Sequence, residues 1–497
     1  MRLLWCVLLV TIVAMPSAAQ TATQTATQTA TRTTLSLDEA LEIARRNNPV
    51  YLQSITGRTR ASAGVRAAYG ALLPSADASL GAGYREGRPQ FFGGVAFGAT
   101  ADIISSSWNL SASSRLSLNT FNEIKRANAG MDAAEADVES ARYTLDNGVT
   151  AQFLLALQTQ ARAALADTLM VQQRLQLQLA QARAGVGSGT SLDVKRAEVA
   201  VGQQEVAALR ARNTEAIARL QLFQQLGVPM PEGVELLADL PMILPTFEIA
   251  DLLTSARQAN PTLAAFKARA RVADANLKSA RGAYTPTLSL NASVGAFTQS
   301  QSNIDLALNQ AAGSAVNRRS NCFTTDSMRT GAGMSSIAAQ CGTIAFTPAQ
   351  AQAIRDANDR FPFGFTRNPY NLSLAISLPL FDGLAREQRL QEASAGRTDA
   401  QYNVRRQELA LTTDVTSALV TLQAARQTVD LQGRIAVTAR EALQLAEERY
   451  RVGASTFVDL TTARAEYERA ETDRIDVVYE FHRAFAALEA AVGRTLR

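Results

Sequence analysis

The feature that most constrains this chain is a short alternating segment that runs directly into a very long stretch of helical periodicity. Apolar residues occupy every second position from Leu372 to Leu380, the pattern of a strand with one apolar face and one polar face. Beyond Gly383 the apolar period becomes about three and a half residues and continues without proline to Tyr450. A helix of that length would span about 100 Å. A strand suited to one tilted bilayer crossing, joined to such a helix, indicates a tube that crosses a membrane and the compartment beneath it.

The same plan occurs twice in the chain. In each copy a short helix ends at an Asn-Pro pair, a second helix follows, and a further proline 25 residues later precedes an alternating strand. Each copy continues with a second strand, a long helix, a glycine turn and a return helix. The return helices, from Gly187 to Gly227 and from Gly453 to Gly493, both span 40 residues. This matched spacing indicates an internal duplication.

Two segments precede the repeats. Residues 1–19 combine Arg2, a short apolar run and the small residues Ser17, Ala18 and Ala19, which predicts a secretory signal peptide. Residues 20–34 are a Thr/Ala/Gln-rich, low-complexity linker that we expect to be disordered.

The two repeats have comparable parts. The first covers 35–227, with strands at about 75–86 and 106–119 and a helical hairpin over 121–227. A connector with four prolines occupies 228–246. The second repeat covers 247–497, with strands at about 286–298 and 369–380, a long outer loop between them, and a helical hairpin over 383–493.

Composition narrows the possible functions. No run of 18 apolar residues occurs beyond the N-terminus, so we expect no transmembrane helix in the mature chain. A single histidine leaves no set of residues for a metal site, and we expect no cofactor. The net charge of +4 is small for 497 residues and indicates no nucleic-acid partner. No nucleophile, base and acid can be assembled into a catalytic set, so we expect no enzyme.

Four strands are too few to close a barrel, because the smallest single-chain barrels use about eight. An open sheet edge in lipid leaves unpaired amides and carbonyls, each of which costs several kcal/mol. Several copies must therefore share one barrel, although the sequence does not give their number.

The chain resembles the TolC family of outer-membrane channels over Leu35 to Gly493. The resemblance rests on the duplicated order of elements and on matched turn signatures, in which Val-Gly is followed after five residues by Asp193-Val194 in one copy and Asp459-Leu460 in the other. It implies an α+β membrane protein, a homotrimer in which four strands per chain build a shared 12-stranded β-barrel above a long periplasmic α-barrel. It also implies an outer-membrane location reaching into the periplasm, a periplasmic adaptor protein and an inner-membrane pump.

The turn glycines Gly187 and Gly453, with Val186 and Val452 before them, are candidate docking tips for the adaptor. A glycine tolerates the positive φ that a helix reversal often needs, so a plain hairpin turn is the alternative explanation.

The resemblance also marks a candidate gate. Asp459 matches an acidic ring at the closed entrance of family members, and three copies would form a constriction that attracts cations. Asp193 lies at the same place in the first repeat. Acids in the first turn of a helix also favour its positive dipole end, which is the alternative for both. Tyr450 matches a family tyrosine that helps to lock the tip. The family arginine five residues later is Ser455 here, and Arg451 is a candidate substitute.

Cys322 and Cys341 lie in the long second outer loop. Because the cell surface is oxidising, we expect them to form a disulfide.

The sequence thus predicts a passive exit duct for drug efflux or type I secretion. A structural coiled-coil surface protein without transport activity is the alternative, but it does not explain four alternating strands in two equal copies. The cargo and the cognate pump are not evident from the sequence.

Overall fold

The computed structural model describes residues 34–93, 95–99, 101–237, 240, 242 and 247–496. The expected signal peptide (1–19), all but the last residue of the linker (20–34) and part of the connector, including Pro241 and Pro245, lie outside the described residues. Among the helices in the described part, none combines the length and apolarity needed to cross a membrane.

The chain separates into two compact units, and each takes segments from both repeats. One unit comprises the chain up to Asn48, Gly148–Ile243 and Val429–His482; the other comprises Pro49–Asn147, Leu244–Thr428 and Arg483–Arg497. The long helices α3 (Leu118–Gly185) and α10 (Ala385–Arg451) each contribute to both units.

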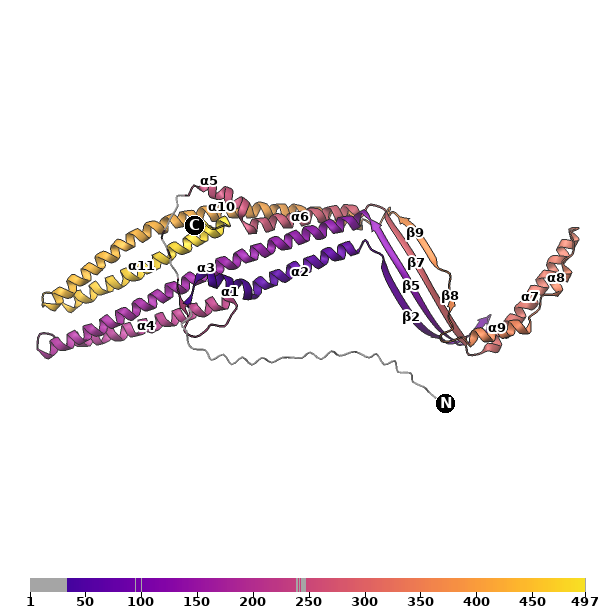
Figure 1. Ribbon diagram of the computed structural model, residues 1–497, viewed down its shortest axis with the longest axis horizontal. Helices are drawn as coiled ribbons and strands as arrows, with labels where there is room; N and C mark the ends of the chain where they lie inside the picture. Colours follow the sequence, from indigo (N-terminus) through magenta and orange to yellow (C-terminus); the bar gives the residue numbers. More distant parts are fainter. Residues whose placement is uncertain are drawn as a thin grey trace, which may run out of the picture. The chain divides into compact units, whose positions relative to one another are not determined.

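The second unit contains an antiparallel sheet (Figure 1). Its main strands lie in the order β2 (Ser75–Arg85), β5 (Ile103–Ser117), β7 (Thr287–Gln301) and β9 (Asn371–Ser377). A fifth, two-residue strand, β8 (Thr366–Arg367), pairs with β7 beyond β9.

The strand bounds differ from the expected ones at the ends. β5 begins three residues earlier than the expected 106 and ends at Ser117, because Leu118 and Asn119 already belong to α3. β7 extends to Gln301, and β9 covers only part of the expected 369–380. Alternation defines the middle of a strand well, but polar residues at its ends carry no face signal.

The register places apolar side chains on one face of the sheet. Leu80 lies opposite Trp108, which lies opposite Ala296, and the row Leu116, Leu288 and Ile376 falls on the same face. The intervening positions are polar: Ser79, Asn109 and Gly295 form one such row, and Ser75, Ser113, Asn291 and Ser373 form another. The sheet therefore has one apolar face and one face of serine, asparagine and glycine.

Both edges of this sheet are open in the single chain. Among the described residues β2 pairs with β5 alone and β9 pairs with β7 alone. Large apolar side chains on these edge strands are exposed, including Leu80 (87%) and Leu374 (67%). An exposed, apolar edge strand is a template for pairing with another chain.

The helices of the second unit follow the order of the strands. Ion pairs join α2 (Pro49–Gly70) to α3 through Arg58 and Glu135 (3.2 Å), and α3 to α6 (Pro261–Gly282) through Asp137 and Arg269 (2.9 Å). A further pair joins α6 to α10. The order α2, α3, α6, α10 thus repeats the order β2, β5, β7, β9. The short helix α5 (Ile249–Ala259) precedes α6 in the chain.

The two outer connections are structured. The first holds the hairpin β3 (Pro89–Phe92) and β4 (Val95–Ala99). The second, expected to be a long loop, is instead helical, with α7 (Ile304–Gly331), α8 (Ala338–Gly342) and α9 (Pro348–Asn358). We call residues 304–358 the outer insert. Cys322 and Cys341 form a disulfide within it. The Asn358 side chain accepts a hydrogen bond from the Gln301 N–H at 2.6 Å, which attaches the insert to the end of β7.

The first unit consists mainly of two helical hairpins (Figure 1). Residues of α3 beyond Gly148 pair with α4 (Ser191–Leu226), and residues of α10 beyond Val429 pair with α11 (Phe457–Val492). The short helix α1 (Leu37–Asn47) and the two-stranded parallel sheet of β1 (Thr34–Leu35) and β6 (Glu235–Leu236) complete the unit.

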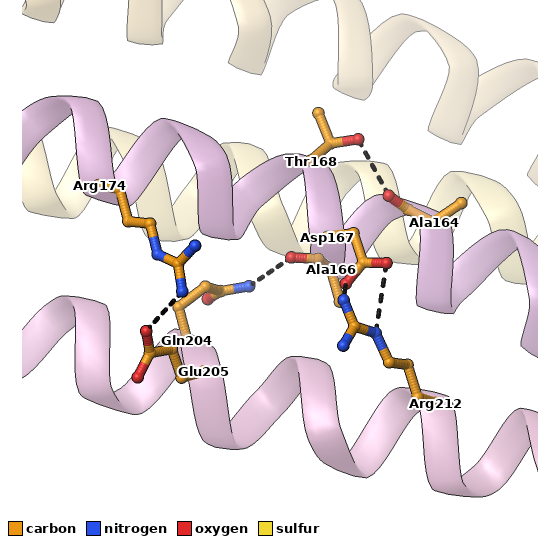
Figure 2. A network of polar contacts seen from close by, with 8 residues as sticks. All are labelled: Ala164, Ala166, Asp167, Thr168, Arg174, Gln204, Glu205 and Arg212. Atoms are coloured by element: carbon orange, nitrogen blue, oxygen red, sulfur yellow. Dashed lines mark hydrogen bonds and ion pairs between the residues drawn. The ribbon is translucent and has the colours of Figure 1, made fainter.

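Exposed polar pairs help to align α3 with α4, as Figure 2 shows. Arg174 pairs with Glu205 at 2.8 Å and Arg212 pairs with Asp167 at 2.7 Å. Both pairs are about half exposed, so each contributes at most about 1 kcal/mol. The buried leucines and alanines between the helices supply most of the stabilisation, as Leu222 and Ala208 illustrate.

Candidate functional site

The hairpin tips of the first unit hold most of the residues singled out by sequence. Gly187 connects α3 to α4 with φ +72°, and Gly453 connects α10 to α11 with φ +79°. At Gly187 no neighbouring atom lies within 4 Å of an added Cβ, so the backbone conformation and not the space requires glycine there. The preceding Val186 and Val452 are 80% and 74% exposed. The tips therefore present apolar side chains to their surroundings.

Asp193 and Asp459 take the same part in the two tips. The Asp193 carboxylate accepts a hydrogen bond from the Thr190 hydroxyl at 2.7 Å, and the Asp193 N–H donates to that hydroxyl oxygen at 3.2 Å. Asp459 makes the equivalent pair with Thr456, at 2.8 and 3.2 Å. Each aspartate therefore closes a capping box at the start of a return helix. The Thr456 N–H and hydroxyl, which donate to the carboxylate, lower the pKa of Asp459.

A buried apolar cluster lies beside the tips and joins the two hairpins. Its buried members are Ala180, Ala197, Leu443, Tyr450, Phe457 and Leu460. The first two come from α3 and α4, and the other four come from the second hairpin. We call these six residues the tip cluster. The Tyr450 and Phe457 rings meet edge to face, with centroids 6.0 Å apart.

Tyr450 is contacted by an arginine that the sequence analysis did not single out. Arg183 of α3 donates a hydrogen bond to the Tyr450 carbonyl, and its guanidinium carbon lies 4.6 Å from the centre of the Tyr450 ring. The expected substitute, Arg451, is instead two-thirds exposed and pairs with Glu448 three residues earlier in its own helix. Because Arg451 follows Tyr450 directly, it lies about 100° further around the helix and projects away from the ring.

The internal repeat offers a way to identify Arg183 from the sequence. Arg183 lies four residues before Gly187, as Arg449 lies four residues before Gly453. Aligning the tips would have drawn attention to both arginines.

Further along α3, polar contacts continue to join the hairpins. Arg162 binds Asp476 of α11 through two nitrogen atoms, and Gln158 donates to the same carboxylate at 2.8 Å. Arg464 is 4% exposed, contacts Gln173 at 3.2 Å and pairs with Glu447 at 2.6 Å. These contacts order the helices of this unit as α4, α3, α11 and α10.

The outer helices of that order keep unpartnered apolar stripes. On α4 the stripe has heptad-like spacing, with Leu192, Val199, Val206, Leu209 and Leu220, each 47–64% exposed. On α10 a groove of about 790 Å³ is lined by Leu431, Ile435, Ala442 and Ala470 of the second hairpin, with Arg469 and Asp473 among its charged residues. Exposed stripes of this spacing are typical of helices that pack against further helices.

The described residues hold no group of three or more His, Cys, Asp or Glu side chains arranged to bind a metal ion.

Sequence comparison adds independent findings. The family model described as outer membrane efflux protein matches residues 40–228 and 346–494, more than half of the chain. The chain is also similar to the pyoverdine export outer membrane protein OpmQ of Pseudomonas putida. The two are 24% identical over 472 residues, which cover 92% of this chain and 85% of OpmQ.

Structural comparison gives the same fold. A membrane protein from Pseudomonas aeruginosa aligns with a TM-score of 0.67 at 20% identity, covering 92% of this chain and 90% of that one. The outer-membrane channel OprN aligns with a TM-score of 0.68 at 18% identity, with the same coverage of both chains. The predicted fold class, long helical hairpins with four main strands that contribute to a β-barrel, is confirmed.

Proposed function

Because the chain belongs to the outer membrane efflux protein family, we propose that it is the exit duct of a tripartite export system. In this role it is a passive outer-membrane channel that a periplasmic adaptor and an inner-membrane pump open from the inside. The observation that carries the proposal is the sheet with one apolar face, one polar face and two open edges, in which β5 runs directly into the long helix α3.

A homotrimer completes the sheet. Each chain supplies β2, β5, β7 and β9, so three chains would supply 12 strands, and the open edge of β9 would pair with β2 of the next copy. Closure removes the unpaired backbone groups that lipid does not tolerate. The apolar face, with Trp108 and Leu110, would contact lipid, and the serine-rich face would line the pore.

The tips are the proposed docking ends for the adaptor. Gly187 and Gly453 hold tight reversals that expose Val186 and Val452, and an adaptor helix could pack against these valines. Asp193 and Asp459 would place two carboxylates per chain near the entrance, where they would attract cations. Their capping hydrogen bonds fix them in place and leave the charge available.

The relative OpmQ is named for pyoverdine export, which supports small molecules as one class of cargo, beside proteins exported by type I secretion. The cargo class is tested by growing a deletion strain with toxic small molecules and by comparing its secreted proteins with those of the parent.

The channel itself is tested with purified mature protein. We expect heat-sensitive trimers in outer-membrane fractions and step-like ion currents after insertion into a planar lipid bilayer. A protein that stays monomeric and water-soluble without detergent, and carries no current, would instead match a structural surface protein.

A further inference from the structure

Arg183 makes an inter-hairpin contact that lies close to both tips. It belongs to the last turn of α3, while the carbonyl that accepts its hydrogen bond belongs to Tyr450 at the end of α10. The contact therefore joins the first hairpin to the second at the ends of their longest helices.

One guanidinium touches both turns. Its second terminal nitrogen donates to the Ser188 carbonyl at 3.4 Å, inside the tip of its own hairpin. The same nitrogen would lie 3.8 Å from a Cβ built on Gly453, inside the other tip. The last carbonyls of a helix lack intrahelical donors and carry its negative dipole end, so a cation there is favourable. Arg183 thus caps α10 from a different hairpin.

The ring of Tyr450 adds a second, independent attachment. Tyr450 is only 6% exposed, with the Arg183 guanidinium 4.6 Å from its centre and the Phe457 ring 6.0 Å away. An arginine over an aromatic face is held by attraction to the ring electrons, and more strongly where water is excluded. Separating the hairpins would break the hydrogen bond and this stacking together.

Comparison of the repeats shows that, among the described residues, the reciprocal contact, from the second tip to the first, is not made. Arg449 takes the place of Arg183 in the second tip and is exposed, while Ala184 takes the place of Tyr450 in the first tip. The first repeat therefore supplies the cation, and the second supplies the aromatic ring and the main-chain carbonyl.

We propose that Arg183 is a positioning residue that holds the two hairpin tips of each chain together and so sets the resting width of the inner end of the duct. This inference rests on the proposed channel function. It assigns the resting closure to the arginine, the ring and a main-chain carbonyl, and gives no part to the phenol hydroxyl of Tyr450.

The test compares resting currents of purified trimers in planar bilayers. We expect Arg183→Gln to raise the resting conductance, because losing both attachments shifts a closed-to-open equilibrium by about tenfold. Arg183→Lys keeps the charge but loses the flat stacking surface, so its conductance should lie between those of Arg183→Gln and the wild type.

Arg449→Gln is the matched control, because it removes the same charge from the equivalent place in the other repeat. An equal rise in Arg449→Gln and Arg183→Gln would overturn the proposal, since loss of charge alone would then explain the effect. Wild-type conductance in Arg183→Gln would overturn it as well.

Export in a deletion strain separates failure of this inference from failure of the channel function. If wild-type protein restores export and Arg183→Gln conducts like wild type, the proposed role of Arg183 is wrong and the channel function is unaffected. If wild-type protein does not restore export, and neither it nor the variants carry any current, the proposed channel function is wrong as well.

Discussion

At the residue scale, the junction between each short helix and its return helix depends on one glycine and one asparagine. The Asn48 side chain donates to the Gln225 carbonyl at 2.8 Å, and the Asn260 side chain donates to the Ala491 carbonyl at 3.1 Å. In the first repeat Gly227 ends the return helix α4 with φ +77°. A Cβ added to Gly227 would lie only 2.5 Å from the Asn47 carbonyl oxygen. The left-handed backbone conformation and the lack of space therefore both exclude a side chain at Gly227.

Gly227→Ala should destabilise the protein by about 2 kcal/mol or more, because the left-handed backbone and the clash with Asn47 both oppose it. The midpoint of thermal unfolding in detergent measures the effect. Gly202→Ala is the control: Gly202 lies inside α4 with open space around it, so alanine there should stabilise the helix by up to about 1 kcal/mol. Equal midpoints for the two variants would show that the junction is not under this constraint.

Two substitutions of Asp459 separate its structural role as a helix cap from its proposed electrostatic role in attracting cations. Asparagine can still accept the Thr456 hydrogen bonds but carries no charge, whereas alanine loses both properties. We expect Asp459→Asn and Asp459→Ala to reduce cation selectivity alike, measured as the reversal potential under a salt gradient. Asp459→Ala should lower thermal stability more than Asp459→Asn does, because it loses the hydrogen bonds as well as the charge. Unchanged selectivity in both variants would leave Asp459 as a helix cap alone.

The pH dependence of the Asp459 cap follows from the direction of its pKa shift. Its folded pKa lies below the ordinary value of 3.8, so its contribution to stability is complete above the unfolded pKa. That contribution is lost as the pH falls through the folded pKa. Near neutral pH the carboxylate is charged, as the proposed attraction of cations requires.

At the scale of elements, the alternating and proline-free patterns were enough to place the strands and hairpins. The matched distances from Pro49 to Pro74 and from Pro261 to Pro286 predicted a duplication. The structure places an Asn-Pro junction in each repeat beside its return helix.

Two features could not be predicted from periodicity. The outer insert is helical although it follows a strand and was expected to be a loop, because α7 is largely exposed and so lacks a clear apolar face. The contact of Arg183 with Tyr450 joins residues 267 apart in sequence, and tertiary packing alone brings them together. Arg451 was the expected partner of Tyr450 because it follows Tyr450 directly in the sequence of the same tip.

The disulfide in the outer insert gives a prediction at this scale. Cys322 and Cys341 are separated by 19 residues, and closing such a loop removes about 3 kcal/mol of unfolded-state entropy. The double substitution Cys322→Ser and Cys341→Ser should make residues 304–358 more sensitive to added protease while trimers and conductance persist. Wild-type protein treated with reductant should give the same cleavage pattern. An insert that resists protease equally in both forms would show that packing on β7 holds it without the disulfide.

At the scale of the whole molecule, each unit has open elements at the two ends of its own order of strands or helices. In the sheet the unpaired strands are β2 and β9, and β9 precedes α10 in the chain. In the first unit the exposed apolar stripes lie on α4 and α10. In the proposed trimer we therefore expect α4 of one copy to pack against the α10 groove of the next copy, because these are exposed apolar surfaces of the first unit.

This arrangement predicts which residues of neighbouring copies meet. Val206 lies 19 residues after Gly187, and Ile435 lies 18 residues before Gly453. At the rise of an α-helix both are about 27 Å from their tips. The double variant Val206→Cys with Ile435→Cys should form covalent dimers and trimers under mild oxidation, and the series should end at three chains on a denaturing gel.

A register control makes the cross-linking prediction specific. Leu445 lies on the same exposed stripe of α10 but ten residues nearer to Gly453, about 15 Å along the helix from Ile435. Val206→Cys combined with Leu445→Cys should therefore stay monomeric on the gel, as should each single variant. Equal cross-linking of both pairs would mean random collision in the membrane. A series that ended at another number of chains would correct the trimer, because closure of the ring fixes the largest covalent species that neighbouring pairs can form.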